Sequence, residues 1–142
     1  MYLEINGDRT IGEIQNDFCA WYPFLKIEFF RNGAVRRDRY PITKLIPANR
    51  RLKDAWYWKK DDGALEVKDI MTVTELENAL IDQFGLSAQV FRRSGNLWLE
   101  TTITDNWTLK QQNDHGKEIT VGKNNVHNPD SLDYELNRDP NP

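Results

Sequence analysis

The sequence contains a single cysteine, Cys19, and only two histidines, His115 and His127. One cysteine excludes an intrachain disulfide and favours a reducing, cytoplasmic setting; its place on an expected helix favours an inert thiol. The histidines are too far apart for a compact metal-ligand pattern, even with Asp114 and Asp130 near them. We therefore expect neither a bound metal nor a cofactor.

Long apolar runs and catalytic motifs are also missing. No window approaches the roughly 20 apolar residues of a membrane span, and the opening residues MYLEINGDRT lack the basic and apolar regions of a secretory signal. There is no glycine-rich phosphate loop or nucleophile elbow, and neither Ser87 nor Ser94 has a histidine nearby. The sequence therefore leans towards a non-enzyme that does not enter a membrane.

What the chain does have is enough material for one core. It has 142 residues, of which 39% are hydrophobic and 29% are charged. This length and composition are typical of a single folded domain that needs no disulfide or metal for stability.

The chain also contains an internal repeat. Shifted by 62 residues, the segment that begins at Leu3 aligns without gaps with the segment that begins at Leu65. Identical pairs recur along the alignment: Leu3 with Leu65, Glu4 with Glu66, Thr10 with Thr72, Glu13 with Glu75, Asn16 with Asn78, Phe29 with Phe91, Arg31 with Arg93 and Gly33 with Gly95. The repeat predicts two related halves, residues 1–62 and 63–124, followed by a polar tail over 125–142.

Each half carries the signals of one principal helix. Thr10 with Glu13, and Thr72 with Glu75, have the spacing of a capping box, in which the two side chains bind each other's backbone amides. Apolar residues at helical spacing follow both caps. Pro23 closes the first helix and Gly85 closes the second.

Strands flank each expected helix. We expect strands over 2–6 and 64–68 before the helices, and a hairpin after each helix, over 24–40 in the first half and 87–102 in the second. The side-chain phase of the second hairpin stays open, because Ile27 aligns with Val90 only if the offset grows by one residue after the helix.

The stretch after the second hairpin has two competing interpretations. Thr108 and Gln111 form a further capping-box pattern, and Gly116 could end a short helix. Alternatively, residues 107–112 could pair with 117–121 as two strands.

These elements predict an α+β fold, a two-layer sandwich made of duplicated βαββ(α) units. The two strands that flank a helix should share a sheet through a right-handed crossover, which gives a mixed or antiparallel sheet, or two packed halves. The helices should cover mainly one face, so the other face is either solvated or covered by a partner.

Basic residues concentrate between positions 31 and 60. This segment holds ten Lys or Arg and two acidic residues, a net charge of +8, in a chain whose net charge is −3. Basic and aromatic residues interleave there, which favours single-stranded nucleic acid or another polyanion as one candidate ligand. The candidate binding residues are Arg36, Arg37, Arg50, Arg51, Lys53, Trp56, Trp58 and Lys59.

The tryptophans also suit a protein interface. In the run Leu97-Trp98-Leu99 both alternating faces are apolar, so at least one face should meet another layer or another chain. Trp56 and Trp58 fall on one side if their run is extended. Trp56, Trp58 and Trp98 are therefore candidate interface residues for a homodimer or a protein partner.

Two segments, VFRRSGNLWLETT over 90–102 and DNWTLKQQN over 105–113, resemble a run in a family of small uncharacterised bacterial proteins. The family shares a TIxEIQ-like helix start and a YPFLKIEFF-like strand, so the resemblance spans most of residues 1–116. It implies a bacterial, intracellular protein and supplies no activity or site residues.

Two functions from different classes follow from these observations. The leading one is a non-catalytic interaction domain that self-associates, and the alternative is polyanion binding through residues 31–60. An enzyme whose site is assembled from distant residues is a third interpretation. Sequence alone leaves the partner unnamed.

Overall fold

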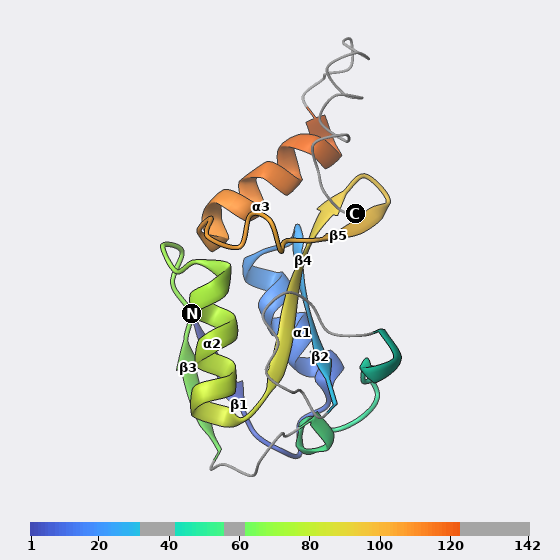
Figure 1. Ribbon diagram of the computed structural model, residues 1–142, viewed down its shortest axis with the longest axis vertical. Helices are drawn as coiled ribbons and strands as arrows, with labels where there is room; N and C mark the ends of the chain where they lie inside the picture. Colours follow the sequence, from blue (N-terminus) through green and yellow to red (C-terminus); the bar gives the residue numbers. More distant parts are fainter. Residues whose placement is uncertain (32–41, 56–61, 123–142) are drawn as a thin grey trace.

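The computed structural model describes residues 1–31, 42–55 and 62–122 (Figure 1). The elements follow in the order β1 (Tyr2–Ile5), α1 (Ile11–Trp21), β2 (Leu25–Phe30), η1 (Ile42–Lys44), η2 (Leu52–Ala55), β3 (Gly63–Glu66), α2 (Val73–Phe84), β4 (Ser87–Ser94), β5 (Leu97–Glu100), α3 (Leu109–Lys117) and η3 (Glu118–Gly122). The expected strand over 34–40 and the tail over 125–142 lie outside the described residues.

The described residues form an α+β fold with two small antiparallel sheets and three α-helices. One sheet pairs β1 with β3, and the other has the order β2-β4-β5. β4 runs through the centre of Figure 1, with α1, α2 and α3 around it. No helix in the described ranges is long and apolar enough to cross a membrane.

The prediction that the two strands flanking each helix share a sheet is wrong. β1 pairs with β3, in a register that sets Leu3 opposite Leu65, while β2 pairs with β4. β1 and β2, which flank α1, therefore lie in different sheets, and so do β3 and β4, which flank α2. Antiparallel pairing of this kind needs no crossover within one sheet.

All three capping boxes are confirmed. Thr10 and Glu13 exchange side-chain to backbone hydrogen bonds of 3.1 and 3.3 Å, and Thr72 and Glu75 exchange two bonds of 3.0 Å. Thr108 accepts the amide of residue 111 at 3.1 Å, and the Gln111 side chain accepts the Thr108 amide at 2.8 Å. α3 is therefore a helix, and the alternative strand pairing of 107–112 with 117–121 is wrong.

The first turns of α1 and α2 are completed by the loops that come later in the chain. In α1, Ile11 and Gly12 donate their amides to the carbonyls of Arg50 and Ala48, both at 2.9 Å. These bonds satisfy amides that have no partner inside the helix.

α2 is held in the same way. Val73 and Thr74 donate their amides to the carbonyls of Trp107 and Asp105, at 3.2 and 2.9 Å. The loop before η2 therefore contacts the start of α1 in the same way as the loop before α3 contacts the start of α2.

The helix ends settle the phase that the sequence left open. α1 has 11 residues and ends before Pro23, whereas α2 has 12 and ends at Gly85, whose φ of 67° is left-handed and suits glycine. The extra residue in α2 moves the following strand by one position. Ile27 consequently lies directly opposite Val90 in the pair of β2 and β4.

The core lies between the helices and one face of the β2-β4-β5 sheet. Leu25, Ile27 and Phe29 of β2 are fully buried, as are the following residues of α1 and α2: Ile11, Ile14, Phe18, Val73, Leu76 and Leu80. α1 packs against β1 and β2, α2 packs against β4, and α3 packs against β4 and β2. The opposite face of that sheet carries Lys26 and Phe91, and it leads to the candidate site.

Candidate interaction surface

The structure describes three of the eight residues proposed for polyanion binding. Arg50, Arg51 and Lys53 lie on an exposed segment around η2. The other five, Arg36, Arg37, Trp56, Trp58 and Lys59, lie outside the described residues.

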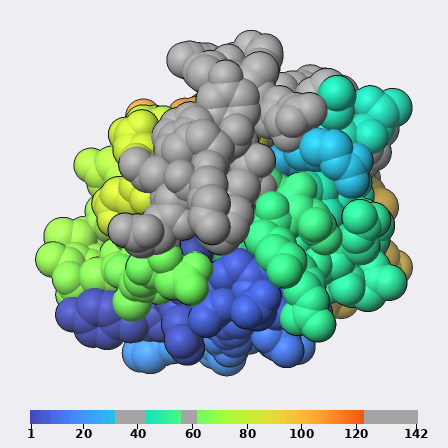
Figure 2. Space-filling model, turned by 90° about the horizontal axis from the view of Figure 1, so that it is seen from below, coloured from blue at the N-terminus to red at the C-terminus, as the bar shows by residue number. Residues whose placement is uncertain are grey.

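Each of these three cations contacts another group of the chain. Arg50 Nε lies 3.3 Å from Asp54 Oδ2, and Lys53 Nζ lies 3.4 Å from Asp8 Oδ1. Arg51 Nη1 donates to the backbone carbonyl of Asp8. In Figure 2 the blue N-terminal segment accordingly lies against the green segment that contains η2. Such exposed ion pairs stabilise the fold little, but they offset part of the local positive charge.

Trp98, the described member of the interface set, lies on β5 opposite Arg93. Lys26 Nζ lies 5.1 Å from the centroid of the Trp98 ring and 5.8 Å from that of Phe91. The same ammonium lies 3.1 Å from Glu28 Oε2. The half-buried Trp98 ring thus belongs to a mixed aromatic and charged layer on the sheet face away from the helices.

Backbone hydrogen bonds determine which way the edge of β5 faces. Val90 donates its amide to Glu77 Oε2 at 2.9 Å, and its carbonyl accepts the Thr101 hydroxyl at 2.8 Å. The amide of Arg93, three residues after Val90, donates to the carbonyl of Phe24 at 2.9 Å, on the side of β4 that faces β2. Even-numbered residues of β4 therefore face β5, and odd-numbered ones face β2.

This alternation fixes the outward groups of β5. Leu97 and Leu99 pair with Ser94 and Arg92, residues whose backbone groups face β5. Trp98 alternates with them, so its N–H and C=O point away from β4, towards the outer edge of the sheet. The two-residue turn that begins at Gly95, whose φ is 64°, is closed by the hydrogen-bonded pair of Ser94 and Leu97, which agrees with this alternation.

The opposite edge of the sheet is covered. Phe29 accepts the amide of Ile46 at 3.0 Å, and Arg31 donates its amide to the carbonyl of Lys44 at 2.8 Å. The Gln15 side chain donates to the carbonyl of Ile27 at 2.8 Å. Within residues 1–31, 42–55 and 62–122, no comparable segment covers Trp98 on β5.

Two exposed aliphatic side chains lie near the β4–β5 turn. Leu97 is 61% exposed and Val121 is 63% exposed. The Thr120 hydroxyl accepts the Gly95 amide at 3.1 Å and lies 3.3 Å from the Arg93 carbonyl, which fastens η3 to the β4–β5 turn. Both aliphatic side chains therefore come from segments that are tied together.

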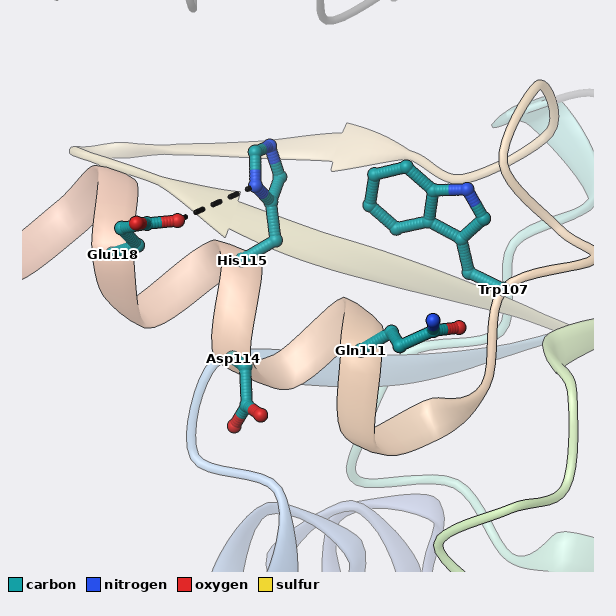
Figure 3. Close-up of a pocket in the computed structure, with 5 residues that line it drawn as sticks. All are labelled: Trp107, Gln111, Asp114, His115 and Glu118. Carbon is teal, nitrogen blue, oxygen red and sulfur yellow. Dashed lines mark ion pairs between the residues drawn. The ribbon is translucent and has the colours of Figure 1, made fainter.

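A second feature is an open hollow of about 310 Å³ on α3, shown in Figure 3. It is lined by Trp107, Gln111, Asp114, His115 and Glu118. The His115 ring stands edge-on to Trp107, with centroids 5.4 Å apart, and His115 Nδ1 lies 3.9 Å from Glu118 Oε1. Asp114 points away from these rings and binds Lys110 at 2.7 Å.

The hollow does not gather a metal-ligand set. Nowhere in the described ranges do three or more His, Cys, Asp or Glu side chains come close enough to hold a metal ion. His127 and Asp130, which the sequence places near His115 and Asp114, lie outside those ranges.

Arg92 lies near Trp107, one of the residues that line the hollow, and was not singled out from the sequence. Its side chain is 1% exposed, its Nη1 donates to Gln112 Oε1 at 2.7 Å, and its guanidinium lies 5.9 Å from the Trp107 ring centroid. Gln112 in turn donates to the Thr104 carbonyl at 2.6 Å. This cluster anchors α3 to β4. The sequence did contain a signal for the burial of Arg92: side chains alternate between the two faces of a strand, so Arg92 lies on the same face of β4 as Val90.

Glu77 is the other residue that sequence reasoning passed over. Burial raises the pKa of its carboxyl to about 8, although the Val90 amide opposes the rise, and the nearby Asp105 charge adds to it. Its signal was the repeat, which aligns Glu77 with Gln15, another residue that binds a strand backbone.

Comparison with protein-family models, curated proteins and solved structures finds no match to this chain.

Proposed function

We propose that this chain is a non-catalytic interaction domain that binds a protein partner through the β4–β5 hairpin. The observation that carries this proposal is the outer edge of β5, where the backbone groups of Trp98 face outward beside the exposed Leu97. Exposed strand edges recruit another strand, and exposed aliphatic groups next to them add apolar burial.

Charge and composition of the hairpin support a protein partner. β5 reads Leu-Trp-Leu-Glu, and it contains no Lys or Pro, the residues that usually protect an edge from pairing. Large aromatic and aliphatic groups with few charges are typical of interface centres.

The test compares two exposed apolar positions. Leu97→Asp places a charge beside the β5 edge, and Ile70→Asp places the same charge at a side chain that is 77% exposed and lies outside the hairpin. Tagged protein is used to capture partners from extract. The proposal expects the capture of a specific protein to be lost with Leu97→Asp and kept with Ile70→Asp; equal capture by both variants contradicts it.

We also infer that the chain consists of two related halves, 1–62 and 63–124, arranged about a local two-fold axis as a two-layer sandwich. Leu3 opposite Leu65 and Ile27 opposite Val90 support this inference, because a two-fold axis brings equivalent residues together. The matching bonds from α1 and α2 to the later loops support it further.

Binding of single-stranded nucleic acid or another polyanion through residues 31–60 remains the alternative proposal. Its test is quenching of tryptophan fluorescence by a mixed-sequence single-stranded oligonucleotide at several salt concentrations. Saturable quenching that weakens steeply with salt, and that is lost with Arg50→Glu plus Arg51→Glu, supports the alternative. No quenching at low salt contradicts it.

A further inference from the structure

We infer that β5 pairs antiparallel with β5 of a second copy of this chain, with Trp98 at the two-fold axis, so that the two three-stranded sheets become continuous. This inference rests on the proposed interaction function, and it names the partner and the geometry of that same edge.

The kind of partner follows from the backbone. The Trp98 N–H and C=O point to the outer edge, where a partner must supply a carbonyl and an amide at strand spacing. Only an extended main chain offers both groups in that arrangement, as in β-strand addition. The partner at this edge is therefore a strand.

The self-complementarity of β5 points to a second copy. In an antiparallel pair centred on Trp98, Leu97 of one copy faces Leu99 of the other, and Asn96 faces Glu100. Apolar groups then meet apolar groups, and no like charges lie directly opposite. Centring the pair on Glu100, the next residue with outward backbone groups, would set two carboxylates opposite each other.

The side chains on both faces of the strand gain from this pairing. On the outer face the two Trp98 rings become cross-strand neighbours, a favourable aromatic pair, while each keeps its Lys26 at 5.1 Å. On the other face the 61% exposed Leu97 becomes covered by the Leu99 of the second copy. A two-fold contact of one strand on itself closes after two chains, so it gives a dimer and no filament.

The same kind of antiparallel strand pairing already occurs within the chain. β1 pairs with β3 about Leu3 and Leu65, and β2 pairs with β4 about Ile27 and Val90. Both are antiparallel pairings of corresponding strands. A β5 pair would extend this arrangement between two chains.

The test measures mass by sedimentation velocity over a concentration series up to about 1 mM, the range in which weak association is detectable. Trp98→Pro removes the outward N–H, and because that amide does not bind β4, the ladder within the hairpin stays intact. Trp98→Thr is the matched control, since it keeps the amide and suits a strand. Circular dichroism and thermal unfolding check that both variants are folded.

We expect the wild-type mass to rise from one chain to two, Trp98→Pro to stay at one chain, and Trp98→Thr to form a dimer with an affinity reduced about tenfold. A wild-type chain that stays single at every concentration overturns the inference, as does a Trp98→Pro variant that dimerises like the wild type. If a single wild-type chain still captures a partner in a way that depends on Leu97, the second copy is excluded while the interaction function stands.

A cross-linking measurement covers the case in which Trp98→Pro does not fold. With Cys19 replaced by Ser, Trp98→Cys places two thiols across the axis, at a separation that a disulfide spans. Ile103→Cys, at a 71% exposed side chain past the end of β5, is the control. Oxidised dimer from Trp98→Cys alone supports the inference, and equal yields from the two variants overturn it.

Discussion

Ile27 and Val90 lie directly opposite each other in β2 and β4, and each has an outward backbone group bound by a side chain of the preceding helix. Gln15 donates to the Ile27 carbonyl, while Glu77 accepts the Val90 amide. The two positions match in the repeat but differ in chemistry, because only Glu77 can ionise. Of these two contacts, only the one made by Glu77 therefore changes with pH.

We predict that Glu77→Gln removes a pH dependence of stability. The pKa of Glu77 in the folded chain, about 8, lies above the ordinary value of 4.5. As the pH rises, the unfolded chain therefore loses the Glu77 proton at a lower pH than the folded chain does. The contribution of Glu77 to stability is therefore complete below about pH 4.5 and is lost as the pH rises through about 8. Between pH 5 and pH 9 the wild type should lose roughly 4 kcal/mol at this site.

Thermal unfolding from pH 5 to pH 9 measures this effect. Glu77→Gln keeps an oxygen for the Val90 amide and should show a flatter profile, with a higher Tm than the wild type at pH 9. Asp82→Asn, which removes an exposed carboxylate from the same helix, should follow the wild-type profile. Parallel profiles for the wild type and Glu77→Gln would contradict the prediction.

Gly116→Ala should destabilise the fold, although alanine favours helices. An added Cβ would lie 3.0 Å from both Arg92 Cγ and Phe24 Cβ, and 3.2 Å from the Arg93 carbonyl oxygen. Overpacking of this kind costs about 1–3 kcal/mol, more than the gain of about 1 kcal/mol in helix propensity. Urea unfolding tests this, with Lys117→Ala at an exposed neighbouring position as the control. A stabilised Gly116→Ala would show that α3 can move away from β4.

The contacts at Gly116 also show what sequence can and cannot predict. Local signals placed the helices well, since Thr10, Thr72 and Thr108 each start a helix at the predicted residue. Each capping box joins two residues that lie within four positions of each other in the sequence. Gly116 was interpreted as a helix end because glycine is common there, but its role is a close approach to Arg92, 24 residues away in the chain.

Strand pairing was the part of the fold that local pattern could not determine. The sequence of β1 suits pairing with β2 or with β3 equally, and the choice depends on the packing of both halves. The same holds for the candidate site. The run Leu97-Trp98-Leu99 indicated a strand with two apolar faces. That one edge of this strand is open follows only from the sheet order, in which β4 lies on one side of β5.

Removing one cap should test how far the two principal helices depend on their N-termini. Thr72→Ala removes the oxygen that accepts the Glu75 amide and should cost about 1 kcal/mol, whereas Thr72→Ser keeps that oxygen and should cost little. Urea unfolding of both variants measures the difference. Equal losses for alanine and serine would attribute the effect to packing of the threonine methyl group.

A final prediction concerns the buried pair of Arg92 and Gln112. Arg92→Met keeps an apolar stem but removes the donor at 2.7 Å from Gln112 Oε1, so a buried acceptor loses this donor. We expect a loss of about 1–3 kcal/mol in urea unfolding. Gln112→Leu alone should also destabilise, because it removes both the acceptor for Arg92 and the donor to Thr104.

The double variant decides whether the two side chains act as a unit. With both polar groups replaced, neither is left buried without the other, so the combined loss should be smaller than the sum of the single losses by roughly 1 kcal/mol. Additive losses would mean that Arg92 and Gln112 stabilise the chain independently. In that case the anchoring of α3 to β4 would depend on packing at Gly116 more than on this hydrogen bond.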